Sequence, residues 1–177
     1  MNNEKHPLHI AFMLIIFSML IFYSLFRLHV HMEVESLKNQ ISKGFYIVYV
    51  DASYVISIGN LIVAPIIIVY IVLNYIAKHP RMDIRWVTIA AVFALIIALP
   101  GQYWEFGRLQ QIARSHGFVE CPPFTLASGA KTVDAMALDS KYCMDDEINR
   151  LGMNGYYQEL ERIDNLLKER KAPNLYN

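Results

Sequence analysis

A chain of 177 residues is long enough for one small soluble domain or for a bundle of a few membrane helices. Hydrophobic residues make up 55% of it and its mean hydropathy is +0.28, which is more apolar than a typical soluble domain. The formal net charge is +0, so no basic surplus points to nucleic acid as a partner. Residues 1–100 hold seven Lys or Arg and five Asp or Glu, whereas residues 101–177 hold nine and eleven. The sequence therefore predicts an apolar membrane part followed by a part with an ordinary soluble surface.

The first apolar run, residues 8–28, contains no acidic residue and carries only His9 and Arg27 as basic groups, near its ends. A helix of this length extends about 30 Å, which matches the hydrocarbon thickness of a bilayer. A cleaved signal peptide is the alternative, because Lys5 precedes the run. However, the run is longer than the apolar core of a signal peptide, and no pair of small residues follows it as a cleavage site. We therefore expect a retained transmembrane helix.

After this run the chain becomes polar, and it contains one group of metal-ligand residue types: His29, His31, Glu33 and Glu35. On a strand all four side chains would share one face, whereas on a helix they would scatter around it. Zinc and copper sites need several ligands that converge. Because we expect this segment to extend the first helix, we interpret the group as a solvated helix end and predict no metal site.

The next two apolar runs are residues 52–77 and 86–103, and each is long enough to cross a bilayer. Pro65 lies inside the first of them, where neighbouring helices can make a proline tolerable. The stretch before them, residues 44–50, is aromatic and β-branched, which is typical of a short strand or of a segment at the membrane surface. The sequence therefore predicts three spans in total.

Small and polar residues recur at helical spacing within the second and third runs. They are Ser53, Ser57, Asn60 and Ala64 in the second run, and Ala90, Ala94 and Ala98 in the third. Faces of this kind let two membrane helices approach closely. Alanine and serine are also common in membrane helices that do not use them for packing, so both interpretations stay open.

The connection between the second and third spans, residues 78–85, carries Lys78, Arg81 and Arg85 against a single acidic residue. The positive-inside rule places such a turn in the cytoplasm. Counted over all flanking segments, however, basic residues divide four against five between the two sides, which does not decide the orientation. The density of charge in this turn favours a cytoplasmic amino terminus and a carboxyl terminus outside the cytoplasm. The cysteines Cys121 and Cys143 favour the same orientation, because a disulfide between them would need an oxidising compartment such as a periplasm.

Beyond residue 107 no apolar run is long enough to cross again. We therefore expect a mainly α membrane protein, with a membrane domain of residues 1–107 and a small α+β periplasmic domain of residues 108–177. Its expected elements are an extension of the third helix over 102–114, strands at 118–121 and 131–138, and a helix over 145–171 that breaks at Asn154-Gly155. Leu160, Ile163 and Leu167 form an apolar stripe on that helix, which we expect to dock on the strands of the same domain.

The chain has two cysteines, Cys121 and Cys143, and no C-x-x-C pattern, which excludes a thioredoxin-like centre and a zinc ribbon. In an oxidising compartment two cysteines with none to spare predict one disulfide. The alternative is a pair of unpaired structural thiols. A bridge would close a loop with twenty-one residues between its ends and stabilise the domain by about 3 kcal/mol on the chain-entropy model.

Motifs that carry catalysis are missing from the sequence. No serine lies in a G-x-S-x-G pattern, and neither G-x-x-x-x-G-K-[ST] nor H-E-x-x-H occurs. Asp51 and Asn60 are the polar residues nearest the membrane interior, and such residues are candidates for function. A proton or ion pathway needs a longer series of polar groups. We therefore predict a protein that is not an enzyme and needs no cofactor.

Two segments of the tail, residues 117–123 (GFVECPP) and 139–143 (DSKYC), resemble a family of small enterobacterial inner-membrane proteins. Those proteins have a few amino-terminal spans and a cysteine-containing carboxyl-terminal segment, and the resemblance covers residues 106–144. It implies no activity. In size, span count and lack of catalytic residues, the chain is also similar to membrane-embedded immunity proteins, which protect bacteria from pore-forming bacteriocins or secreted antibacterial effectors.

This second resemblance gives the leading hypothesis for function. The chain would bind a protein toxin in or beside the inner membrane and hold its membrane-active part in a non-conducting state. The alternative is an accessory or scaffold subunit of an envelope complex, with the tail as its docking piece. The lipid bilayer is a partner in both cases. The sequence does not set the oligomeric state.

Overall fold

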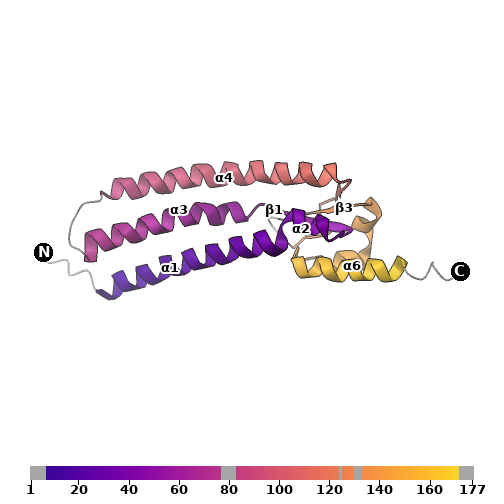
Figure 1. Ribbon diagram of the computed structural model, residues 1–177, viewed down its shortest axis with the longest axis horizontal. Coiled ribbons are helices and arrows are strands. Elements are labelled where there is room, and N and C mark those ends of the chain that lie inside the picture. The colour runs from indigo at the N-terminus through magenta and orange to yellow at the C-terminus, as the bar shows by residue number, and fades with distance from the viewer. Residues whose placement is uncertain (1–6, 77–82, 124, 130–132, 172–177) are drawn as a thin grey trace. The chain divides into compact units, whose positions relative to one another are not determined.

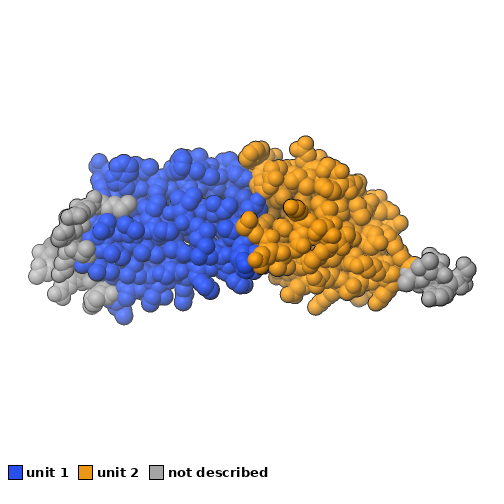
Figure 2. All heavy atoms as spheres, in the orientation of Figure 1, with its two compact units in different colours: residues 1–30, 54–102 blue, residues 31–53, 103–177 orange. Residues whose placement is uncertain are grey.

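The computed structural model describes residues 7–76, 83–123, 125–129 and 133–171. It is mainly helical and divides into two compact units that alternate along the chain (Figure 1). Unit 1 consists of Met1–Val30 and Tyr54–Gln102, and unit 2 of His31–Ser53 and Tyr103–Asn177 (Figure 2). The chain therefore passes between the units three times.

Unit 1 is built from three long apolar helices. They are α1 (Pro7–Val30), α3 (Tyr54–Ile71) with its π-helical continuation η2 (Val72–Ile76), and the first part of α4 (Ile84–Ser115). Their most apolar segments have mean hydropathies of 2.3, 2.6 and 2.0, and each helix is long enough to cross a membrane. The three predicted spans are thus confirmed as helices of membrane-spanning length and composition.

Aspartates mark the points where α3 and α4 begin. The carboxylate of Asp51 accepts hydrogen bonds from the backbone N–H (2.7 Å) and the hydroxyl (3.0 Å) of Ser53, so the chain turns there and α3 starts at Tyr54 rather than at residue 52. The carboxylate of Asp83 accepts a hydrogen bond from the backbone N–H of Arg85 (3.1 Å), and α4 starts two residues before the expected residue 86. From there α4 runs without a break to Ser115, which confirms the predicted extension of the third helix beyond its apolar run.

Unit 2 contains a three-stranded antiparallel sheet in the order β1–β3–β2. Its strands are β1 (Ile47–Asp51), β2 (Val119–Glu120) and β3 (Val133–Ala137). Ala137 of the central strand lies opposite Ile47 on one side and opposite Val119 on the other. The sheet therefore combines two strands of the tail with one from the segment that joins the first two spans.

This sheet places the boundary between the two parts differently from the prediction. The sequence assigned residues 44–50 to a membrane domain that ends at residue 107. In the structure they lead into β1, which pairs along its whole length with β3 and belongs with the tail. The partner of β1 lies far away in the sequence, so no local pattern around residues 44–50 reports it.

Short helices complete unit 2. They are the π-helical turn η1 (His31–Glu35), α2 (Leu37–Ser42), the 3₁₀ helix η3 (Ser140–Met144), α5 (Asp146–Leu151) and α6 (Tyr157–Lys171). The side chain of Asp145 caps α5 by accepting the backbone N–H of Glu147 (3.0 Å) and of Ile148 (3.1 Å). Gly155 has φ +72°, a left-handed conformation that favours glycine, and it separates α5 from α6 as the sequence predicts.

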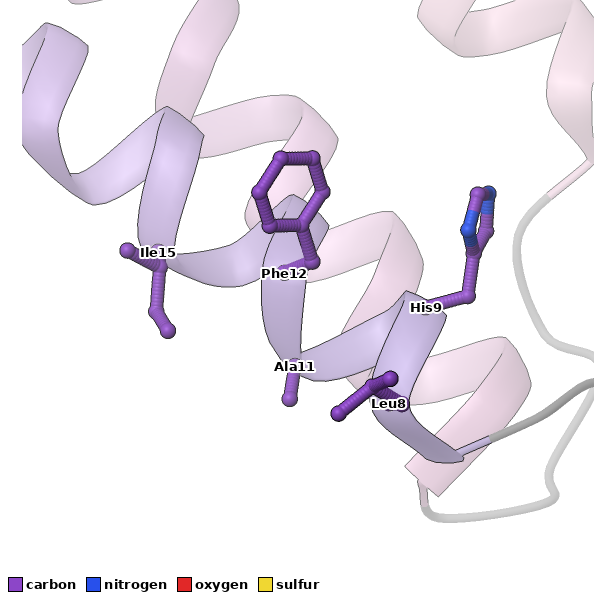
Figure 3. Close-up of a pocket in the computed structure, with 5 residues that line it drawn as sticks. All are labelled: Leu8, His9, Ala11, Phe12 and Ile15. Atoms are coloured by element: carbon purple, nitrogen blue, oxygen red, sulfur yellow. The ribbon is translucent and has the colours of Figure 1, made fainter.

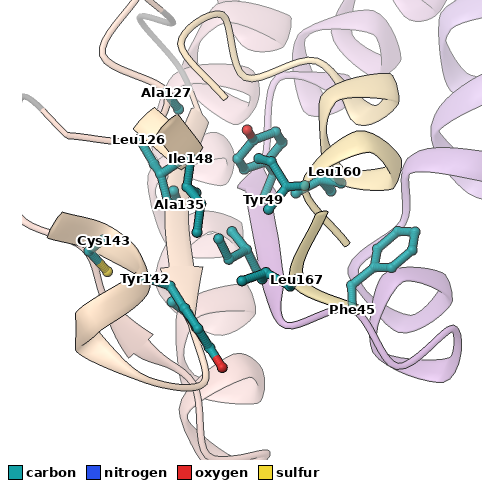
Figure 4. Close-up of a cluster of buried hydrophobic side chains, with 13 residues drawn as sticks. Phe45, Tyr49, Leu126, Ala127, Ala135, Tyr142, Cys143, Ile148, Leu160 and Leu167 are labelled. Carbon is teal, nitrogen blue, oxygen red and sulfur yellow. The ribbon is translucent and has the colours of Figure 1, made fainter. Parts of the chain in front are cut away.

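Both faces of the sheet are buried along β1 and the second half of β3, whereas β2 is exposed. On one face Ile47 and Tyr49 pack with Leu160, Ile163 and Leu167 of α6, so the apolar stripe of this helix docks as expected (Figure 4). The other face packs against the end of α4, and its buried members include Val48, Val50, Leu109, Ala113 and Met136. Successive residues of a strand point to opposite faces, and both faces of β1 are buried. Residues 47–50 are therefore all hydrophobic and do not show the alternation of a half-exposed strand.

Candidate functional site

The two cysteines lie at disulfide distance, with their Sγ atoms 2.07 Å apart. Cys121 follows β2 and donates its backbone N–H to the carbonyl oxygen of Ala135 in β3 (3.1 Å). Cys143 lies in η3 and is fully buried in the core of unit 2. The pairing predicted from the sequence is therefore present, and it fastens the end of the edge strand to the turn that follows the central strand.

Helices α3 and α4 approach each other at Gly59. A Cβ atom added to Gly59 would lie 3.2 Å from the Cβ of Ala98 and 3.8 Å from the carbonyl oxygen of Ala94. Both alanines are buried, and Ala90 on the same helix is half-buried. Two of the alanines predicted to pack in the third span, Ala94 and Ala98, thus contact Gly59 of α3. The sequence analysis did not single out this glycine, although a glycine inside an apolar run is a signal of close helix approach.

The polar residues of the predicted second-span face lie in different surroundings. Asn60 is directed to α1, where its side-chain amide donates hydrogen bonds to the hydroxyl of Ser24 (2.6 Å) and to the carbonyl oxygen of Leu20 (3.1 Å). Ser57 is buried within unit 1. Ser53 precedes α3 and is held by Asp51. Ser24, which is 2% exposed, is a second participant that the sequence interpretation missed.

The basic turn between the second and third spans is described only in part. Lys78 and Arg81 lie outside the described residues. Arg85 lies at the start of α4 with a side chain that is 85% exposed, 3.7 Å from the carboxylate of Asp83. An ion pair this exposed contributes little to stability. The charge of Arg85 therefore remains accessible at the surface of unit 1.

The group His29, His31, Glu33 and Glu35 lies on helical backbone, because α1 ends at Val30 and η1 covers the rest. Within the described ranges, no three His, Cys, Asp or Glu side chains are grouped closely enough to hold a metal ion. Helical backbone turns successive members of this group in different directions, unlike the strand that would align them.

Two apolar concavities border α1 in unit 1. Among the described residues, one concavity of about 720 Å³ is lined by Leu8, His9, Ala11, Phe12 and Ile15 of this helix (Figure 3). His9 and Phe12 point to one side of the ribbon and the others away from it, so this is an open helix surface. The other, of about 500 Å³, lies between α1, the end of α3 with η2, and the start of α4. Both are lined mostly by apolar side chains, as sites for apolar molecules are.

Charged side chains on the surface of unit 2 connect α6 to neighbouring segments. Arg170 of α6 donates one hydrogen bond to the carboxylate of Asp145 (2.6 Å) and another to that of Glu147, and its guanidinium lowers the pKa of Asp145. At the end of the same helix, the ammonium group of Lys171 lies 3.8 Å from the ring centroid of Tyr46. These contacts hold α6 against α5 and the start of β1.

No protein-family model, curated protein or solved structure matches this chain. Its function therefore has to be argued from geometry alone. The described residues supply three apolar helices of membrane-spanning length, a sheet unit closed by a cysteine pair, and apolar concavities.

Proposed function

We propose that this chain is a three-span protein of the bacterial inner membrane that acts as an immunity protein, neutralising a membrane-active or periplasm-acting toxin by binding it. The amino terminus is cytoplasmic, and unit 2 lies in the periplasm. No catalytic step is involved.

The pairing of β1 with β3 is the observation that carries the membrane arrangement. β1 precedes α3 and β3 follows α4, so the segment between the first two spans and the tail must lie on the same side of a membrane. The chain between β1 and β3 then crosses the membrane twice, once through α3 and once through α4. Helix α1 is the third crossing. The turn of residues 78–85 then lies on the opposite side, where the positive-inside rule expects its basic residues.

The exposed side chains of α4 support a bilayer around this helix. Trp86 is 63% exposed and Trp104 is 76% exposed. They are eighteen residues apart in one helix, which is about 27 Å and close to the thickness of the hydrocarbon layer. Tryptophan collects at the two surfaces of a membrane. The large side chains exposed between the two tryptophans are apolar, among them Phe93, Leu95, Ile96 and Leu99.

Unit 2 offers apolar side chains for a protein partner. Met144, Met153 and Tyr156, before and after α5, are 69%, 50% and 66% exposed. Exposed apolar and aromatic side chains supply much of the binding free energy at protein interfaces. We therefore assign toxin binding to this part of unit 2, with the spans holding it at the membrane.

A protection assay tests the immunity role. A sensitive strain that expresses the full chain should survive a toxin encoded beside its gene. The variant Met144→Asp, matched in abundance, should protect less, whereas Glu169→Ala on the exposed side of α6 should protect fully. Unchanged killing by every adjacent toxin candidate would refute the role. Co-purification with a multi-component envelope assembly instead would favour a scaffold subunit.

A topology assay tests the membrane arrangement separately. A reporter that works only outside the cytoplasm should be active when fused after Asn177 and inactive when inserted between Lys78 and Arg81. Activity at the internal position with silence at the carboxyl terminus would reverse the proposed orientation.

A further inference from the structure

The groove of about 500 Å³ in unit 1 lies where all three apolar helices meet. Apolar side chains from each helix line it, including Met13 and Phe17 of α1, Ile67 and Ile71 of α3, and Ile84 and Val87 of α4. Its polar lining comes from His9, Tyr70 and Tyr75. The described residues that line this groove all belong to unit 1.

Helices α3 and α4 pack closely at Gly59, and the groove lies further along α3. At Gly59 no side chain separates α3 from Ala98 of α4. About 16 Å further along α3, by helix rise, the small residues give way to Tyr70, whose ring meets Tyr75 edge to face with centroids 6.1 Å apart. Both rings line the groove.

A space of this kind needs an apolar occupant. The groove is open to the surroundings and is lined mostly by apolar side chains, so it favours an apolar occupant over water. In a bilayer, the apolar molecules that surround the helices are phospholipid acyl chains. A flexible acyl chain fits a long groove between helices, because it can follow the irregular surface that the side chains leave.

Positive charge lies at the same end of the helices. His9 is in the first turn of α1 and Ile84 is the first residue of α4, and since both line the groove, two helix amino termini lie at this end. Helix amino termini favour negative charge. Arg85 follows Ile84, and its exposed side chain lies 3.7 Å from the carboxylate of Asp83. Basic groups at such positions between membrane helices bind the head groups of acidic lipids.

We propose that this groove binds one anionic phospholipid, with an acyl chain between α1, α3 and α4 and its phosphate beside Arg85. This site depends on the membrane placement proposed above, and it is independent of the immunity role. The lipid would fill the space beside Tyr70 and Tyr75 and so hold α4 against the other two helices.

Native mass spectrometry of the full chain, extracted in mild detergent and mixed with lipids of matched acyl chains, tests this site. One phosphatidylglycerol should stay bound per chain, about fivefold in excess over phosphatidylethanolamine, as one basic group near the lipid surface predicts. Ile67→Trp, which fills the groove, should abolish retention of both lipids. Ile62→Trp, on the exposed side of the same helix, should leave it unchanged. Arg85→Gln should remove the preference and keep the retention, whereas Arg162→Gln in unit 2 should change neither.

Three results would overturn the site: equal retention of the two lipids by the unaltered chain, full retention by Ile67→Trp, or loss of retention in Ile62→Trp. If Ile67→Trp fails to fold by size exclusion and circular dichroism, Val87→Phe fills the groove from α4 and takes its place. Recovery of the unaltered chain in the soluble fraction would refute the membrane placement itself. A chain that is membrane-bound but retains no lipid would refute the lipid site alone.

Discussion

The side chain of Gln40 acts as a strand partner for Tyr49. Its carbonyl oxygen accepts the backbone N–H of Tyr49 (2.7 Å), and its amide group donates to the backbone carbonyl of Tyr49 (3.1 Å) and to that of Glu35 (2.7 Å). Gln40 is 2% exposed. One side chain from α2 therefore satisfies both backbone groups of Tyr49 on the outer edge of β1, an edge that would otherwise be open to pairing with another strand.

Replacing Gln40 by alanine should open this edge. The substitution leaves two buried backbone groups of Tyr49 without partners, and each costs about 1–3 kcal/mol. We expect the free energy of opening at β1, measured by amide hydrogen exchange on the full chain, to fall by about 2–4 kcal/mol. Gln110→Ala, which removes an exposed hydrogen bond to Asp134 (3.2 Å), is the control and should cost less than about 1 kcal/mol. Equal effects of the two substitutions would contradict the role of Gln40.

The cysteine pair should be closed and stabilising in the exported protein. Thiol labelling of the unreduced, unfolded chain should find no free thiol, and labelling after reduction should find both. Cys121→Ser combined with Cys143→Ser should lower the free energy of unfolding of unit 2 by about 3 kcal/mol, because the loop between them is no longer closed in the unfolded state. Labelling of either cysteine without reduction would show that the chain carries thiols.

The contact between α3 and α4 can be tested by substitution at Gly59, with Gly107 as the control position. Valine at Gly59 would push against Ala98, since even a Cβ there lies 3.2 Å from the Cβ of this alanine. A Cβ at Gly107 meets nothing within 4 Å. We expect Gly59→Val to lower the melting temperature of the chain in detergent, and Gly107→Ala to raise it slightly, because alanine favours a helix by about 1 kcal/mol over glycine. A Gly59→Val variant as stable as the unaltered chain would show that the two helices do not rely on this contact.

The sequence predicts the features that depend on neighbouring residues and fails where distant segments meet. The apolar runs, the break at Gly155 and the pairing of two cysteines are all local or countable. The sequence does not distinguish β1 from a membrane-surface segment, because the helices that cover its two faces, α4 and α6, lie far away along the chain. Apolar residues on both faces of a strand also look like a segment of a membrane surface.

The candidate packing residues show the same limit. Helical periodicity tells which residues share a face, and it does not tell which neighbour that face meets. Gly59 and Asn60 are adjacent in the sequence, yet Gly59 meets α4 while Asn60 bonds to Ser24 of α1. Ser24 itself lies inside an apolar run that gives no reason to single it out. The assignment of partners therefore required the arrangement of all three helices.

The link between Arg170 and Asp145 should appear as a dependence of stability on pH. The guanidinium of Arg170 lowers the pKa of Asp145 in the folded state, so this contribution is present above the unfolded-state value of about 3.9 and is lost as the pH falls through the folded value. Asp145→Asn keeps an oxygen to cap α5 but removes the charge. At neutral pH it should lower the free energy of unfolding of unit 2 by about 1 kcal/mol or less, as for other exposed pairs. The difference from the unaltered chain should shrink below about pH 4. A difference that stays constant from pH 7 to the acid limit would assign the effect to capping instead of to the ion pair.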